Sequence, residues 1–323
     1  MGFFVFFAFV LCGKGLLAGV ARVDCSLPVG VPLAGLNHGP RRVKSFPVPK
    51  PTVFTSFMTP STGIKADGIW CRALTVQDDA GHLATFVSID AIGADGTLRR
   101  NAVRFARALN FSVPEEAVVL SASHTHSGPG AITSEFLWAA APATDLEVPA
   151  LAQMMQQNLA LAMAKSQQSM VPAKLDIGTF NLTGVTNNRR CHISKYVNCD
   201  TIDPNLGILR IDRLSNNETM ALVWNYAMHG TCFGAENLEQ TGDIAGWSNK
   251  YIESLLPEGA VAMFQNADAG DVDPDYSLCQ GDPTSWTGPA IFAKAVMCVK
   301  NLSVCLFLSP LLSQEFCSIF ISK

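Results

Sequence analysis

Residues 118 to 130 read Val118-Val119-Leu120-Ser121-Ala122-Ser123-His124-Thr125-His126-Ser127-Gly128-Pro129-Gly130. The segment begins as the apolar run of a buried strand and ends in a glycine- and proline-rich turn. If the strand continues through His126, the two-residue spacing points the imidazoles of His124 and His126 to the same face. Imidazole is a good zinc ligand, but zinc takes three or four ligands. The pair alone is therefore equally consistent with a metal site and with two hydrogen-bonded loop histidines.

A second strand ends in the same way. Residues 221 to 228 are apolar and are followed by His229-Gly230-Thr231. This repeats the order of strand, histidine and glycine-containing turn, so His229 is the best candidate for a missing zinc ligand. A third apolar run, residues 84 to 89, ends at Asp90. Because open sheets bind ligands at the ends of their strands, Asp90 is a further site candidate.

The remaining elements predict an α/β fold with a mixed β-sheet flanked by helices. Residues 97–109 and 149–168 have helical patterns, with Met154, Met155 and Met163 expected in the core, and a third helix is expected to end at Leu256. Further strands are expected at 69–77, 174–180, 206–211 and 260–264, with a hairpin turn at 78–81.

Three loops carry charged side chains. Residues 33 to 43 contain His38, Arg41 and Arg42, and are either a functional loop or a solvated surface crossing. Residues 186 to 190 hold two arginines. The strand at 260–264 runs into a loop with four acids, Asp268, Asp271, Asp273 and Asp275. Such a loop can bind a hard cation, supply a general base, or be only an acidic turn.

Composition gives the chain a broad class. Its 323 residues are 48% hydrophobic, which is enough for one large domain or two small ones, and the net charge is -4 with no basic block, which argues against nucleic acid as a partner. The N-terminus is apolar from Met1 to Cys12 and then rich in small residues, so we expect a signal peptide at 1–21 with cleavage near Ala18 or Ala21.

Secretion also agrees with ten cysteines, of which Cys191 with Cys199 and Cys298 with Cys305 are closest in sequence. Glycosylation sequons begin at Asn110, Asn181, Asn217 and Asn301. We therefore expect a secreted or cell-surface glycoprotein.

Several blocks together resemble the neutral/alkaline, non-lysosomal ceramidase family. In chain order they are Val87-Ser88-Ile89-Asp90, the block His124 to Gly130, Asn188-Arg189, Ala227-Met228-His229 with Gly242-Asp243, and Ala269-Gly270-Asp271-Val272-Asp273-Pro274. The block from His124 to Gly130 is the most specific. We expect a catalytic domain at 27–300, followed by an apolar tail at 301–323 that has no counterpart in the family. That tail is either a small apolar helix or the translation of a mis-spliced exon end.

The resemblance implies a zinc amidase that hydrolyses the N-acyl bond of ceramide, releasing sphingosine and a fatty acid. It places the two histidine ligands of the zinc on His124 and His229, a substrate-side arginine on Arg189, and His126 beside the metal. In the family, a glutamate and a tyrosine from a later part of the chain complete the site, and an immunoglobulin-like domain follows. We expect this chain to be a single catalytic domain without that later part. A lipid substrate also implies peripheral contact with a membrane.

The acidic loop departs from the family pattern, which reads Asn-x-Gly-Asp-Val-Ser-Pro-Asn. Here Asp273 stands at the serine position, and Asp268 and Asp275 replace the asparagines. A carboxylate cannot replace a hydroxyl nucleophile, but Asp271 or Asp273 can take a proton from a zinc-activated water. In this mechanism, Arg189 and His126 stabilise the oxyanion or protonate the leaving amine. Two alternatives remain open: a catalytically impaired, truncated homologue, and a hydrolase for a different amide or ester.

Overall fold

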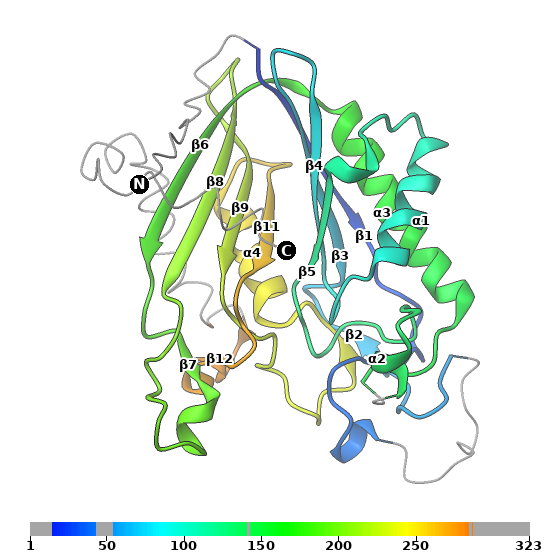
Figure 1. Cartoon of the computed structure of the whole chain (residues 1–323), viewed down its shortest axis with the longest axis vertical. Coiled ribbons are helices and arrows are strands. Elements are labelled where there is room, and N and C mark those ends of the chain that lie inside the picture. The colour runs from blue at the N-terminus through cyan, green and yellow to red at the C-terminus, as the bar shows by residue number, and fades with distance from the viewer. Residues whose placement is uncertain (1–14, 43–53, 141–142, 284–285, 287–323) are drawn as a thin grey trace, which may run out of the picture.

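A mixed β-sheet of eight strands forms the framework of the molecule (Figure 1). The computed structural model describes residues 15–42, 54–140, 143–283 and 286. The strand order is β11-β9-β8-β6-β1-β3-β4-β5. The pairs β4–β5 and β9–β11 are parallel and the other neighbours are antiparallel, which confirms the mixed sheet. The strands are β1 (Leu17–Asp24), β3 (Trp70–Gln77), β4 (Leu83–Ile89), β5 (Val118–Ala122), β6 (Val171–Asn181), β8 (Asn205–Arg213), β9 (Thr219–Tyr226) and β11 (Val261–Asn266).

Two short ribbons add to this framework. Strand β2 (Gly63–Ile64) pairs in parallel with β10 (Glu239–Gln240). Strand β7 (Thr186–Asn188) pairs antiparallel with β12 (Val272–Pro274). The second ribbon joins the arginine loop to the acidic loop, although the two are far apart in the sequence.

Helices α1 (Gly96–Arg107) and α3 (Pro149–Gln168) lie side by side against the half of the sheet that contains β1, β3 and β4 (Figure 1). The Asp95 carboxylate accepts a hydrogen bond from Leu98 N at 2.6 Å and so caps α1. Pro149 occupies the first turn of α3, where a missing N–H costs no helical hydrogen bond. The other two helices are α2 (Phe136–Ala140) and α4 (Asp243–Leu255).

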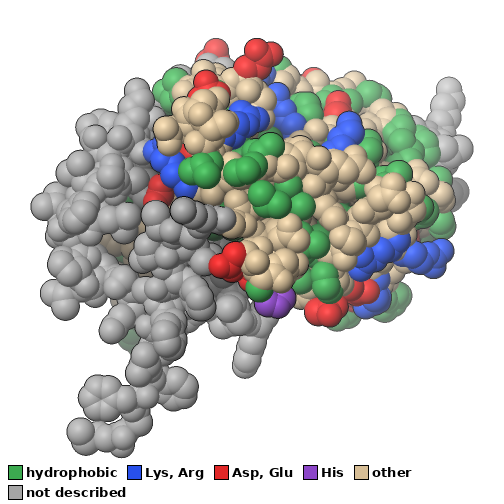
Figure 2. Space-filling view, turned by 90° about the horizontal axis from the view of Figure 1, so that it is seen from above, with side chains coloured by type: hydrophobic (Ala, Val, Ile, Leu, Met, Phe, Trp, Pro, Cys, Tyr) green, Lys and Arg blue, Asp and Glu red, His purple; other side chains and the backbone are tan. Residues whose placement is uncertain are grey.

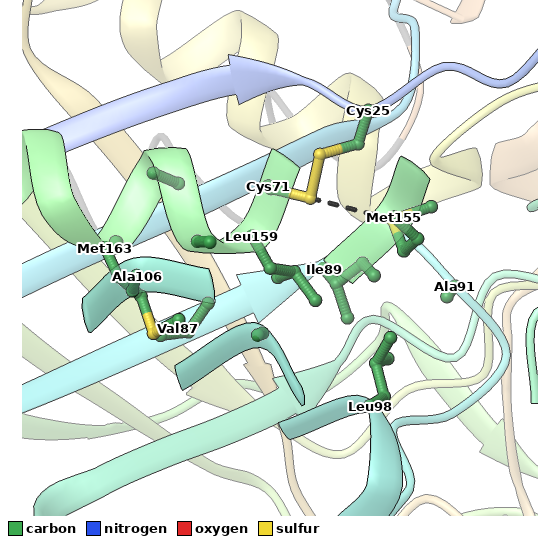
Figure 3. Close-up of a cluster of buried hydrophobic side chains, with 14 of the residues drawn as sticks. Cys25, Cys71, Val87, Ile89, Ala91, Leu98, Ala106, Met155, Leu159 and Met163 are labelled. Atoms are coloured by element: carbon green, nitrogen blue, oxygen red, sulfur yellow. Dashed lines mark hydrogen bonds between the residues drawn. A yellow bond between two sulfur atoms is a disulfide. The ribbon is translucent and has the colours of Figure 1, made fainter. Parts of the chain in front are cut away.

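The core beneath α1 and α3 is built from residues of both helices and of β3 and β4 (Figure 3). Met155 and Met163 are buried in it, as predicted, whereas Met154 is 39% exposed. The prediction for Met154 was wrong because successive helical residues point about 100° apart, and Met154 falls with Gln153 and Gln157 on the exposed side of α3.

The sheet curls so that β11 meets the other half of the molecule. Ser88 Oγ on β4 donates a hydrogen bond to the carbonyl of Phe264 on β11, at 2.7 Å. Ser121 on β5 makes a hydrogen bond with Gln265 on β11. As a result, the ends of β5 and β9 lie close together.

Strand β1 overlaps the predicted cleavage positions, Ala18 and Ala21. It pairs with β3 from Leu17 opposite Gln77 to Asp24 opposite Trp70. Cleavage at Ala18 or Ala21 would remove part of a strand that lies within the sheet. The apolar run at residues 1–14 and the tail at 301–323 lie outside the described residues.

Cys191 and Cys199, one of the two cysteine pairs closest in sequence, form a disulfide. Two further disulfides, which the sequence did not predict, join Cys25 to Cys71 and Cys232 to Cys279. The suggested pair Cys298–Cys305 lies outside the described residues.

The surface carries charges of both signs. On the face that Figure 2 shows, Lys and Arg side chains are interspersed with Asp, Glu and hydrophobic side chains. Within the described ranges, no helix combines the length and the apolar character that crossing a bilayer requires.

Candidate metal centre

The segments that follow β5 and β9 run side by side and bring three histidines together. Thr125 and Gly230 form a parallel bridge, and His126 N donates to the carbonyl of Gly230 at 2.8 Å. A side chain at residue 230 would place its Cβ 2.6 Å from the Cα of Thr125, so only glycine permits this approach.

The strand does not continue through His126, because β5 ends at Ala122. His124 instead adopts a left-handed conformation with φ of 60°. A non-glycine residue in this region costs about 1–2 kcal/mol. The imidazoles of His124 and His126 nevertheless lie close together, because the left-handed turn at His124 orients them instead of the side-chain alternation of a strand.

The Nε2 atom of His124 lies 3.0 Å from Nε2 of His229 and 3.4 Å from Nε2 of His126. Tetrahedral zinc with Zn–N bonds of about 2.0–2.1 Å holds its ligand nitrogens roughly 3.3–3.4 Å apart. The ligand atoms of the three histidines all lie within 4.8 Å of one another. The spacing of the nitrogens therefore fits a zinc ion.

Hydrogen bonds on the far side of two rings support the same interpretation. Nδ1 of His124 lies 2.7 Å from the carbonyl of Ile92, and Nδ1 of His229 lies 2.6 Å from the carbonyl of Ala269. A carbonyl only accepts, so each Nδ1 carries the proton and each Nε2 directs a lone pair toward the other histidine. Two lone pairs facing each other at this distance repel, and a cation between them removes that repulsion.

Burial keeps the three imidazoles neutral, which is the form that binds metal. Burial lowers the pKa of His124 and of His229, whose side chain is 5% exposed. Burial, together with the charges of His124 and His229, lowers the pKa of His126 to about 3. The positive charge of Arg189 contributes in the same direction at all three histidines.

Arg189 and Asp273 lie beside the cluster. Arg189 NH1 is 3.4 Å from Asp273 Oδ1, and NH2 donates to the carbonyl of Gly270 at 2.6 Å. The charge of Asp273 raises the pKa of His229, against the larger effect of burial. The ribbon β7–β12 thus brings both predicted residues to the histidines.

Asp271 has a different place from Asp273. Its carboxylate accepts from Asn188 Nδ2 at 2.8 Å, and its backbone carbonyl accepts from Arg189 N at 2.8 Å. It therefore holds the arginine loop. Of the other two acids, Asp268 is exposed, and Asp275 accepts from the backbone of Ser277 at the start of the turn Tyr276–Cys279.

Asp90, a candidate from its position at a strand end, serves the framework instead. It is fully buried, pairs with Arg72 at 2.9 Å and accepts from Trp70 N at 3.0 Å. A second grouping of metal-ligand types, Cys191, His192 and Cys199, is also not a metal site because its two sulfurs form a disulfide.

Sequence reasoning missed Tyr276. Its hydroxyl lies 3.1 Å from Thr231 Oγ1, and burial raises its pKa, with hydrogen bonding to Asp273 contributing. The disulfide Cys232–Cys279 ties the turn that carries Tyr276 to the loop after His229. A lone aromatic residue after an acidic loop has no diagnostic pattern, so its only signal was its position three residues after Asp273.

Comparisons with known proteins identify the family and the fold of the chain. The family model for the N-terminal part of neutral/alkaline non-lysosomal ceramidases matches residues 54–320, so the match continues into the tail for which we expected no counterpart. The chain is 27% identical over 229 residues to a neutral ceramidase of Drosophila melanogaster, covering 64% of this chain and 31% of that protein. It is 25% identical over 248 residues to a neutral ceramidase of Pseudomonas aeruginosa, covering 70% and 36%.

The crystal structure of the Pseudomonas aeruginosa neutral ceramidase has the same fold, with a TM-score of 0.71 at 20% identity. The superposition covers 88% of this chain and 45% of that one. The chain thus spans about a third of the length of the curated relatives that it matches. On the family match and the shared fold, this chain belongs to the neutral/alkaline non-lysosomal ceramidase family.

Proposed function

We propose that this chain is a zinc-dependent hydrolase that cleaves the N-acyl amide bond of ceramide to sphingosine and a fatty acid. The observation that carries the proposal is the convergence of three neutral imidazoles, His124, His126 and His229, in a member of a family whose relatives are named neutral ceramidases.

His124, His229 and His126 would hold the zinc. The resemblance alone assigned only the first two as ligands, and the position of His126 Nε2 supports it as the third. When bound, zinc supplies a Lewis acid that lowers the pKa of water to about 7 and polarises an amide carbonyl.

Asp273 would take the proton of the attacking water and return it to the leaving amine nitrogen. Arg189 would donate hydrogen bonds to the oxygen of the former carbonyl as it gains charge. Asp271 positions Arg189 through Asn188 and through its own carbonyl. Tyr276 and Arg189 both interact with Asp273.

The test compares zinc content and ceramide hydrolysis of the purified protein with those of a His124→Ala/His229→Ala double variant. We expect about one zinc per chain and ceramide turnover in the wild type, and loss of both in the double variant. His192→Ala is the matched control, because His192 is exposed and belongs to the disulfide-linked group. A wild type without zinc would show an incomplete site and favour the impaired, truncated homologue.

A different amide or ester substrate is the second candidate, and the replacement of the family serine by Asp273 favours it. Asp273 pairs with Arg189, which changes the charge available to a substrate. If the native substrate differs, Asp273→Ser gains ceramide turnover and loses the native activity. No change in either activity would remove this candidate.

We also propose that the protein is secreted and glycosylated and contacts membranes peripherally to reach its lipid substrate. Three disulfides within the described residues suit an oxidising compartment. The sequon asparagines Asn110, Asn181 and Asn217 are exposed, as glycosylation requires. Digestion with a glycosidase that removes N-glycans should lower the apparent mass of protein collected from culture medium, and an unchanged mass would contradict glycosylation.

A further inference from the structure

We infer that Arg41 is a positioning residue of the histidine cluster, acting through the backbone of His126. The inference rests on the proposed metal site. Neither the resemblance nor the family match assigns a role to Arg41, which precedes the matched residues 54–320.

Arg41 is 1% exposed, and its guanidinium bonds two segments of the chain. NH1 donates to the carbonyl of His126 at 2.9 Å, and NH2 donates to Ser127 Oγ at 2.9 Å. Nε donates to the carbonyl of Asn237 at 2.6 Å, and the Asn237 amide in turn donates to Ser127 Oγ at 3.1 Å. These three acceptors are neutral, and the buried carboxylate of Asp243 offsets part of the cost of burying the charge of Arg41.

The segment that leads to Arg41 follows the histidine segment closely. Ala34 N donates to the carbonyl of Gly128 at 2.9 Å, and Gly130 N donates to that of Pro32 at 2.7 Å. The ring of His126 lies against Gly35, where an added Cβ would be 2.6 Å from the ring Cγ. The sequence left open whether loop 33–43 is a functional loop or a solvated surface crossing. In its described part, this loop supports the site.

His126 needs such a support more than the other two histidines do. Its Nδ1 is buried and has no hydrogen-bond partner among the described residues, whereas Nδ1 of His124 and of His229 each bond a carbonyl. Ring orientation at a metal is usually fixed by a bond of that kind. For His126 the direction of Nε2 therefore depends on its backbone, which Arg41 and Gly230 hold, and on the contact with Gly35.

The experiment uses Arg41→Gln and Arg41→Lys, with Arg42→Gln as the control because Arg42 is the next residue and is exposed. Zinc affinity is measured by competition with a chromophoric chelator, and ligand geometry by the absorption spectrum of the Co²⁺-loaded protein. Amide hydrogen exchange of His126 and Ser127 is followed in the metal-free protein. Thermal unfolding reports overall stability.

Arg41→Gln should weaken zinc affinity about 10–100-fold, as loss of an outer-shell partner does, and should alter the Co²⁺ spectrum. Exchange at His126 and Ser127 should accelerate more than elsewhere. The zinc affinity and the local exchange of Arg41→Lys should lie between those of Arg41→Gln and of the wild type. Those of Arg42→Gln should match the wild type.

A folded Arg41→Gln protein with wild-type zinc affinity, spectrum and local exchange would overturn the inference. If Arg41→Gln fails to fold, Arg41→Lys is the deciding variant. Exchange at His126 and Ser127 in Arg41→Lys that equals the exchange in Arg42→Gln would overturn the inference. If the wild type binds no zinc, the proposed function fails, but the exchange of the metal-free protein still decides whether Arg41 holds the His126 backbone.

Discussion

The Nε2 atoms of His124 and His229 lie 3.0 Å apart although 105 residues separate them in the sequence. Each ring donates its Nδ1–H to a backbone carbonyl, so the two lone pairs face each other. His126 adds a third nitrogen 3.4 Å from that of His124. A cation among the three rings would remove the repulsion between these lone pairs.

His126→Ala should lower zinc affinity by more than the ~10–100-fold that loss of an outer-shell partner costs, because it removes one of three protein ligands. Equilibrium titration with zinc measures the effect, and His192→Ala should leave the affinity unchanged. Equal zinc affinity in His126→Ala and the wild type would show that His126 lies beside the metal and is not one of its ligands.

Asp273→Asn should lower kcat about 10²–10⁴-fold, because the amide has nearly the shape of the carboxylate but cannot take a proton from water. Steady-state turnover of the native substrate measures the loss. Asp268→Asn is the matched control, since Asp268 lies in the same loop and is exposed. Similar kcat values for the two variants would exclude Asp273 as the general base.

Asp67 should make stability depend on pH. Burial raises its pKa from 3.8 to about 7, although Thr241 Oγ1 and Gly242 N donate to its Oδ2. Between pH 3.8 and about 7 the folded state binds a proton that the unfolded state has lost, so the contribution of Asp67 to stability falls as pH rises through this range and is constant above it.

The uncharged variant Asp67→Asn removes this contribution. Its free energy of unfolding relative to that of the wild type should therefore rise from about pH 4 to about pH 7 and then level off. Denaturant unfolding at a series of pH values measures the difference. A difference that does not vary with pH would show that Asp67 ionises normally.

Met155→Ala should cost about 2–5 kcal/mol of stability, because Met155 is fully buried in the core under α1 and α3. Met154→Ala should change stability by no more than about 0.5 kcal/mol, since that side chain is 39% exposed and alanine favours helix. Thermal or denaturant unfolding compares the pair. Equal losses would contradict the orientation of α3.

The sequence predicted most elements of the fold because local patterns determine them. Apolar runs predicted β3, β4, β8, β9 and β11 to within a few residues, and periodicity with Pro149 predicted α3. Strand β1 was missed because its small residues follow an apolar N-terminus and read as the end of a leader. Its pairing with β3 on one side and β6 on the other distinguishes it as a strand.

The sequence by itself also determined the chemistry of the site, since it supplied the strand-ending histidines, Arg189 and the acidic loop. Only the tertiary structure decided how these residues meet. The parallel bridge between Thr125 and Gly230 and the left-handed turn at His124 bring His126 to the other two rings. The β7–β12 ribbon gives Asp271 and Asp273 different neighbours. Burial of Arg41 behind His126 has no signal in the sequence, because that contact joins residues 85 positions apart and depends on the packing of three segments.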